Sequence, residues 1–159
     1  MRYRLFLDSD GVLADFDARA IEILDGRRIH EVPKGLLWAR IEKYDREVAK
    51  FFETLPLMKD AEKLVQFVQA NFDFGGILTA TGYTPKDGAE QKCRWYAQHF
   101  PGVKVICVEK SHDKAVHALN AILVDDRQKS IDPWVAAGGI GILHTSVDDT
   151  IEQLRQYIV

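Results

Sequence analysis

The chain has 159 residues, of which 47% are hydrophobic and 28% are charged, a composition that suits one domain with a modest insertion. Its formal net charge of −3 gives no overall attraction to nucleic acid or to an anionic membrane. Since no apolar run approaches the roughly 20 residues of a membrane-spanning helix, we expect no membrane partner.

The chain has two cysteines, Cys93 in a helical pattern and Cys107 in a strand pattern. Their spacing matches neither a zinc site nor a dithiol motif, so we interpret both as buried, reduced thiols. The first strand begins at once and leaves no room for a signal peptide. Together these features predict a cytoplasmic protein.

The first predicted element is a buried strand over residues 3–7, which ends at the run Asp8-Ser9-Asp10-Gly11-Val12. Residues i and i+2 of a strand point to the same side, so the carboxylates of Asp8 and Asp10 begin as neighbouring like charges. Their repulsion is destabilising unless a cation lies between them or one carboxyl is protonated. The run therefore predicts a chemical site at the end of the strand.

The stretch from Asp15 to Leu57 contains helical patterns and no strand. A first pattern follows Asp15, and a longer one places these apolar residues on one face: Leu37, Ile41, Tyr44, Val48, Phe51, Phe52 and Leu55. We predict a small helical cap over residues 16–57, inserted after the first strand. Residues 1–15 and 58–159 would form the core.

From Asp73 onward, predicted strands alternate with predicted helices. The strands cover residues 74–78, 103–108, 121–124 and 140–143. The apolar stripe of the first intervening helix consists of Ala89, Cys93, Tyr96, Ala97 and Phe100, and that of the last helix of Val147, Ile151, Leu154 and Ile158. This alternation indicates an α/β fold of Rossmann-like type, with three α/β/α layers and a parallel sheet covered on both faces.

Polar residues follow directly on three of these strands: Asp8 and Asp10, Thr79 and Thr81, and Asp125 and Asp126. Ligands of parallel sheets bind beyond the carboxyl ends of the strands, so we expect these side chains to meet at one edge. Carboxylate oxygens are the ligands that Mg²⁺ prefers in proteins. A carboxylate can also attack phosphorus and form an aspartyl-phosphate, while a second one moves protons.

The run Asp8-Ser9-Asp10-Gly11-Val12 resembles motif I of the haloacid dehalogenase (HAD) superfamily, Asp-x-Asp-Gly-[Val/Thr]. Thr79 is similar to the second motif of that family, Lys114 to the third, and the pair Asp125-Asp126 to the fourth, all in the family's order. The resemblance implies a HAD-like fold and a Mg²⁺-dependent phosphomonoesterase.

The resemblance also implies a role for each matching residue. Asp8 would be the nucleophile, and Asp10 the general acid/base that donates its backbone carbonyl to the metal. The phosphoryl group would bind to Thr79, Ala80 and Lys114, with Lys110 close enough in sequence to replace Lys114. Asp125 and Asp126 would hold Mg²⁺ together with Asp8, and either of them could be the direct ligand.

Within the superfamily, the runs 12–16 and 51–57 resemble the 5'(3')-deoxyribonucleotidases. There an aromatic residue after motif I lies against the base, a position matched by Phe16, with Trp38 and Phe51 as further candidates. In place of that family's usual Ser-Pro after the second motif, this chain has Ala80-Thr81-Gly82-Tyr83. The expected partner is a small phosphorylated substrate, a (deoxy)nucleotide.

Two other readings remain open. Asp125-Asp126-Arg127, with Trp134 downstream, resembles the 3'-phosphatase domain of phage-type polynucleotide kinases, whose substrate is nucleic acid. The chain could instead be a catalytically silent HAD-fold binding module. Under each reading the short cap leaves the site open, so a second subunit in a homodimer could complete it.

Overall fold

The structure is a computed structural model that describes all 159 residues. The elements, in chain order, are β1 (Arg4–Leu7), α1 (Phe16–Ile23), the 3-10 helix η1 (Ile29–Glu31), α2 (Lys34–Glu47), α3 (Ala61–Asn71), β2 (Asp73–Ala80), α4 (Gly88–His99), β3 (Val105–Val108), the 3-10 helix η2 (Ser111–His117), β4 (Ala121–Asp125), α5 (Gln128–Ala136), β5 (Ile140–Leu143) and α6 (Val147–Arg155).

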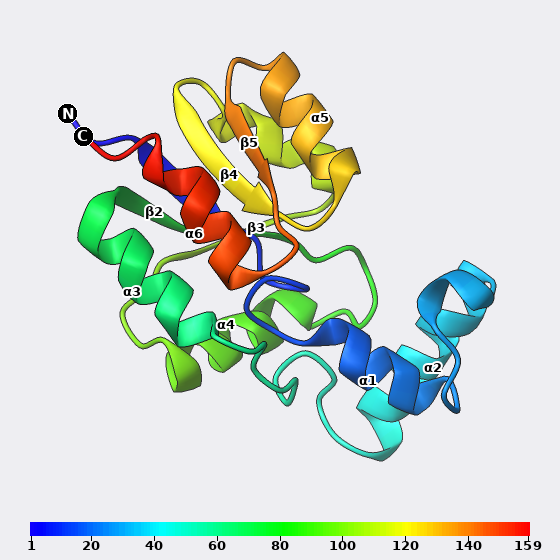
Figure 1. Ribbon diagram of the computed structural model, residues 1–159. Coiled ribbons are helices and arrows are strands. Elements are labelled where there is room, and N and C mark those ends of the chain that lie inside the picture. The colour runs from blue at the N-terminus through cyan, green and yellow to red at the C-terminus, as the bar shows by residue number, and fades with distance from the viewer.

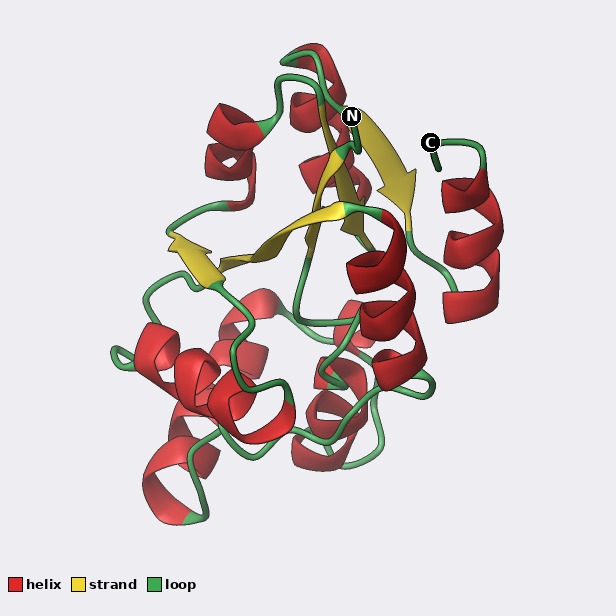
Figure 2. Cartoon of the chain, turned by 90° about the vertical axis from the view of Figure 1, so that its left-hand side faces the viewer, coloured by secondary structure: helices red, strands yellow, loops and turns green.

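The five strands form one parallel sheet in the order β3-β2-β1-β4-β5. Figure 2 shows the strands between helices on either side, so the predicted three-layer α/β/α fold is confirmed. The central strand β1 explains the arrangement, because its apolar residues are buried on both faces. Leu5 and Leu7 pack into the larger core with α3, α4 and α6. Phe6 packs on the other face with Trp134 of α5.

The strand register brings the carboxyl ends of β1 and β4 together, while the neighbouring β2 continues past Ile77 to Ala80. Leu7 pairs with Val124 of β4 and with Ile77 of β2, and the Asp8 N–H donates to the Val124 carbonyl at 2.9 Å. Asp8 and Asp125 therefore follow the paired residues at the same height in the sheet. The sequence prediction that their side chains meet at one edge is built into this register.

The 16–57 segment, called the cap segment below, places α1, η1 and α2 together at one end of the molecule (Figure 1). Its two ends lie side by side, because the Asp15 N–H donates to the Pro56 carbonyl at 2.8 Å and the Met58 N–H donates to the Leu13 carbonyl at 2.8 Å. The chain thus leaves and re-enters the core at one point. The division into core and cap at these residues stays a prediction.

The second helical pattern of the cap segment is shorter than expected. Helix α2 ends at Glu47, and Val48 is 69% exposed. The side chain of Asp45 accepts a hydrogen bond from the Phe51 N–H at 2.8 Å, which turns the chain back on itself. Phe51 and the apolar residues that follow are buried in this turn rather than on a helix face.

The buried face of α4 also differs from the prediction. Cys93 and Ala97 are exposed, so the interpretation of Cys93 as a buried thiol is wrong, and Cys107 is only half-buried. The residues of α4 that are buried are Gly88, Gln91, Lys92, Trp95 and Tyr96. Because the polar residues Gln91 and Lys92 lie on the buried face, the apolar stripe predicted from the sequence is displaced by about one position from the face that is buried.

Two further differences concern helices. The sequence analysis assigned no element to residues 61–71, where α3 buries Leu64 and Val68 against the sheet. In the last helix Ile158 is 37% exposed, because α6 ends at Arg155. No helix combines the length and the apolar character needed to cross a membrane.

Candidate active site

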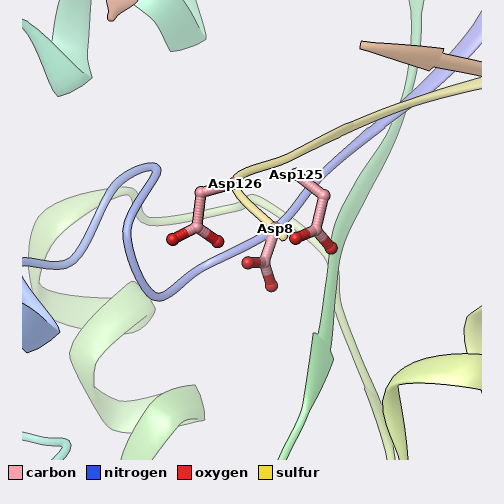
Figure 3. Close-up of side chains that lie close together, drawn as sticks. All are labelled: Asp8, Asp125 and Asp126. Atoms are coloured by element: carbon pink, nitrogen blue, oxygen red, sulfur yellow. The ribbon is translucent and has the colours of Figure 1, made fainter. Parts of the chain in front are cut away.

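Three carboxylates meet at the carboxyl edge of the sheet. Asp8 follows β1, Asp125 ends β4 and Asp126 comes next, and one oxygen from each lies within 4.8 Å of the others. Figure 3 shows the three side chains grouped together. Asp8 and Asp125 are buried, whereas Asp126 is exposed towards a cavity. The strand register has brought together like charges that repel one another.

The electrostatics of this cluster favour a bound cation. Partial burial and the charge of Asp8 raise the pKa of Asp125 to about 6 and that of Asp126 to about 8. The charge of Asp125 adds to that of Asp8 in raising the pKa of Asp126. A cation among the carboxylates relieves the repulsion that these shifts express. The donor set is all oxygen, which fits Mg²⁺, and the carboxylate of Asp10 is not part of it.

Lys114, delivered by η2, is buried between two of these carboxylates. Its Nζ donates to Asp8 Oδ1 at 2.9 Å and to Asp125 Oδ2 at 2.7 Å. Burial alone would lower the pKa of Lys114, but Asp8 and Asp125 raise it on balance, so the ammonium stays charged. Lys110, the alternative, is exposed at the mouth of the cavity and makes neither contact. The structure thus places Lys114, and not Lys110, against the expected nucleophile.

A second lysine, Lys92 of α4, occupies the other side of the site and was missed by the sequence analysis. Its Nζ donates to Asp10 Oδ2 at 3.0 Å, to Thr79 Oγ1 at 2.7 Å and to the Ala80 carbonyl at 3.1 Å. The side chain is 3% exposed, and its ammonium lies 4.8 Å from the ring centre of Phe52. Lys92 therefore joins motif I, the end of β2 and the cap segment.

The carboxyl of Asp10 is held by one oxygen only. Oδ2 accepts from Lys92, whereas Oδ1 is buried and has no hydrogen-bond partner. Burial raises the pKa of Asp10, an effect that Lys92 opposes and Asp8 increases. A carboxyl with a raised pKa and one free oxygen is suited to giving and taking a proton.

Motif I turns tightly at Gly11. The Ser9 carbonyl accepts from the N–H groups of Leu13 at 2.9 Å and Ala14 at 3.0 Å, and Gly11 has a φ of +81°, in the left-handed region. A Cβ at this position would lie 2.0 Å from Asp126 Oδ2. Only glycine allows the turn to pass this close to the acidic cluster.

A cavity of about 530 Å³ lies between the acidic cluster and the cap segment. Its apolar wall comes from the cap segment and consists of Phe16, Ile29, Leu37, Trp38 and Phe52. Phe51 is fully buried behind Phe16, with the ring centres 5.6 Å apart, so it cannot contact a ligand in this conformation. Of the two β2 residues expected to bind phosphate, Ala80 lines the cavity and Thr79 lies buried below it, under Lys92.

No protein-family model matches the chain, and no curated protein matches it. Two solved structures are similar. A hydrolase from Streptococcus pneumoniae TIGR4 superposes with a TM-score of 0.58 at 15% identity, over 98% of this chain and 100% of that one. The second, a HAD family hydrolase from Deinococcus radiodurans R1 with bound phosphate and sodium, has a TM-score of 0.56 at 12% identity, over 97% of this chain and 88% of that one. The chain has a HAD-like fold.

At these identities the likeness covers the HAD-like fold alone. The matches cover nearly the whole length of each chain. Activity and substrate must be argued from the site itself.

Proposed function

We propose that the protein is a Mg²⁺-dependent phosphomonoesterase that works through an aspartyl-phosphate on Asp8 and acts on small phosphorylated substrates. The observation that carries this proposal is the convergence of Asp8, Asp125 and Asp126 with the buried Lys114 beside one cavity, next to a second buried lysine, Lys92, that bonds to Asp10. Folding alone gives no reason to bury so many charges at the end of a sheet. The neighbour that holds phosphate, a HAD family hydrolase, supports the same class of reaction.

In the first step, an oxygen of Asp8 attacks phosphorus and the bond to the leaving oxygen breaks. Asp10 in its protonated form gives a proton to that oxygen, and burial, which raises the pKa of this carboxyl, favours that role. Lys92 holds Oδ2 of Asp10 and leaves Oδ1 as the atom that carries the proton. Asp8 becomes an aspartyl-phosphate and the alcohol departs.

In the second step, the carboxylate of Asp10 takes a proton from a water molecule, which attacks the phosphorus of the aspartyl-phosphate. Inorganic phosphate leaves and both carboxyl groups return to their starting states. Lys114, fixed between Asp8 and Asp125, stabilises the charge that builds up on the phosphoryl oxygens. Such preorganised charge is usually the largest contribution to catalysis.

Mg²⁺ would be held by Asp8 and Asp126, where it would supply positive charge opposite the phosphoryl oxygens. Asp126 is the better candidate for the direct ligand, because both oxygens of Asp125 already accept hydrogen bonds. Oδ2 accepts from Lys114 and Oδ1 accepts from the Arg127 N–H at 3.0 Å. Asp125 would then act by holding Lys114 and the loop that carries Asp126.

The substrate class that fits the cavity best is a deoxynucleoside monophosphate. The apolar wall offered by Phe16 and Trp38 suits a flat ring, and the rings of Phe16 and Phe52 stack 6.1 Å apart at 25° to stiffen that wall. Trp38 is 40% exposed, so its ring is available to a ligand. This substrate class agrees with the resemblance to 5'(3')-deoxyribonucleotidases in the runs that flank the cap segment.

The experiment is a phosphate-release assay with Mg²⁺ or with excess chelator. Its substrates are deoxynucleoside and nucleoside monophosphates, sugar phosphates and a 3'-phosphorylated oligonucleotide. We expect turnover of deoxynucleoside monophosphates that stops with chelator. Chelator-insensitive hydrolysis would contradict the metal site, and preference for the oligonucleotide would favour the 3'-phosphatase. Tight phosphate binding without turnover of any substrate would favour the alternative that the protein is a catalytically silent binding module.

A further inference from the structure

The mouth of the cavity carries cations that no carboxylate neutralises. Lys110, Arg127 and Lys129 line the cavity and are exposed, and none has a carboxylate oxygen within 4.0 Å. Asp17 and Glu109 line the same cavity but form no ion pair with them. The buried lysine in the cavity wall, Lys114, is by contrast paired with two carboxylates. The mouth therefore offers three cations that no carboxylate engages, in a chain whose net charge is −3.

Three cations near α5 lie close enough to repel one another. Arg127 and Lys129 stand at the start of α5, and Lys34 begins α2 of the cap segment. The charge of Arg127, followed by partial burial and the charge of Lys34, lowers the pKa of Lys129. Like charges gathered from core and cap destabilise the folded chain slightly. Folding therefore gives no reason for this placement, whereas an anionic ligand would.

The phosphoryl group that reacts cannot be the anion in question. Under the proposed function it lies at Asp8, where Lys114 and the metal neutralise it. The side chain of Arg127 is available to a different group, since only its backbone N–H is used in holding Asp125. A volume of about 530 Å³ leaves room for a ligand larger than the reacting phosphate and one ring.

We infer that Arg127 and Lys129, with Lys110 on the same cavity, form a subsite for a second phosphate group on the same small-molecule substrate, which is a bisphosphate such as a deoxynucleoside 3',5'-bisphosphate. This inference rests on the proposed function for the fate of the first phosphate. Arg127 would bind the second phosphate through its guanidinium fork, while Lys129 and Lys110 add charge at the mouth. The subsite selects the substrate and takes no part in bond breaking.

The test compares kcat/KM for a deoxynucleoside 3',5'-bisphosphate with kcat/KM for the matching 5'-monophosphate. We expect the bisphosphate to be preferred at least about tenfold, through a lower KM. The double variant Arg127→Gln/Lys129→Gln should lose most of this ratio, and the ratio should also shrink as salt is raised, because the cations are exposed. Lys43→Gln is the matched control, since Lys43 is an exposed cation of α2 that does not line the cavity.

A ratio near one in the wild-type protein, with the monophosphate turned over normally, would overturn the subsite and leave the proposed function standing. Should neither compound be hydrolysed, calorimetry on Asp8→Asn with Mg²⁺ gives the same ratio as dissociation constants, and equal constants would again overturn it. A 3'-phosphorylated dinucleotide serves as a third ligand. Stronger preference for it than for the bisphosphate would overturn the small-molecule assignment in favour of a nucleic-acid end.

Discussion

The cations around the cavity fall into two sets that differ in their partners. Lys92 and Lys114, the inner set, are buried and bonded to carboxylates. Lys110, Arg127 and Lys129, the outer set, are exposed and have no carboxylate within 4.0 Å. A buried ion pair is strongly destabilised when one partner is lost, whereas an exposed cation is solvated by itself. The inner set therefore shapes the reacting centre, and the outer set stays free for a ligand.

The carboxylates of the site divide in the same way. Asp8, Asp10 and Asp125 each bond to an inner lysine. Asp126 has no lysine or arginine nitrogen within 4.0 Å, although it belongs to the same acidic cluster. The paired acids keep their positions without a metal. The unpaired acid is the one whose charge the proposed metal ion would neutralise, so the predictions below separate paired groups from unpaired ones.

The largest effect is expected for Asp8→Asn, which removes the proposed nucleophile, a carboxylate that is paired with Lys114 of the inner set. Turnover should fall by about 10⁴-fold or more, because an amide does not form the acyl-phosphate intermediate. The fold should persist, since Asn can still accept a hydrogen bond from Lys114. Phosphate release and a circular dichroism spectrum measure the two properties. Activity near that of the wild-type protein would remove the nucleophile assignment.

The next effect concerns the two inner lysines. Lys92→Met should lower kcat by about 10²–10⁴-fold, the range of general acid–base catalysis, and reduce stability by about 3–5 kcal/mol because Asp10 loses its buried partner. Since the charge of Lys92 lowers the pKa of Asp10, its loss should raise that pKa. The basic limb of the kcat/KM profile should then move to higher pH.

Lys114→Met gives the matched comparison within the inner set. It should impair turnover to a similar extent but move that limb upward less, because Lys114 bonds to Asp8 and Asp125 and lowers the pKa of Asp10 less than Lys92 does. Lys43→Met, on the exposed surface of α2, controls for loss of a lysine. Lys92→Arg should recover part of the activity. Identical pH profiles for the Lys92 and Lys114 variants would show that Lys92 has no specific link to Asp10.

Most of the fold could be predicted from the sequence because it depends on short local patterns. The apolar runs before Asp8, Thr79 and Asp125 each belong to a strand, and their parallel register follows from the alternation with helices. The convergence of the acidic residues came from the same information. It needed no knowledge of any side chain beyond its place after a strand.

Lys92 could not be found in that way, because it reaches the site from the inner face of a helix. The apolar stripe predicted through Cys93 and Ala97 does not include Lys92. A stripe drawn through Lys92, Trp95 and Tyr96, which have helical spacing, would have placed it inside. Its true position depends on a tertiary contact, since a buried lysine is stable only opposite the carboxylate of Asp10.

A smaller effect is expected at Gly11, because the absence of a side chain there leaves room for the unpaired carboxylate of Asp126. Gly11→Ala adds a strained φ, at about 1–2 kcal/mol, and a Cβ that would lie 2.0 Å from Asp126 Oδ2. Gly26→Ala is the matched control, with a φ of +88° and no atom within 4 Å of the added Cβ. Both variants should melt earlier, but only Gly11→Ala should weaken Mg²⁺ binding, by about tenfold or more. Equal Mg²⁺ affinities, measured by calorimetry, would separate Asp126 from the metal.

The smallest effect is the pH dependence of stability without metal. The pKa values of Asp125 and Asp126 in the folded protein, about 6 and about 8, lie above the ordinary 3.8. The folded chain therefore binds more protons than the unfolded chain, and the free energy of unfolding falls as pH rises between about 4 and 8. In chelator, the Tm at pH 8 should lie below that at pH 5.5 by on the order of 5 °C.

Mg²⁺ should reverse this trend, because it binds the deprotonated carboxylates and so stabilises the protein more at pH 8 than at pH 5.5. Asp126→Asn isolates the unpaired carboxylate from the paired ones. In this variant the fall in Tm between pH 5.5 and pH 8 in chelator should be smaller, and so should the rise in Tm on adding Mg²⁺. The bonds of Lys114 to Asp8 and Asp125 should remain. A Tm that rises with pH in chelator would mean that the inner lysines already neutralise the whole cluster. The division into paired and unpaired charges would then not extend to Asp126.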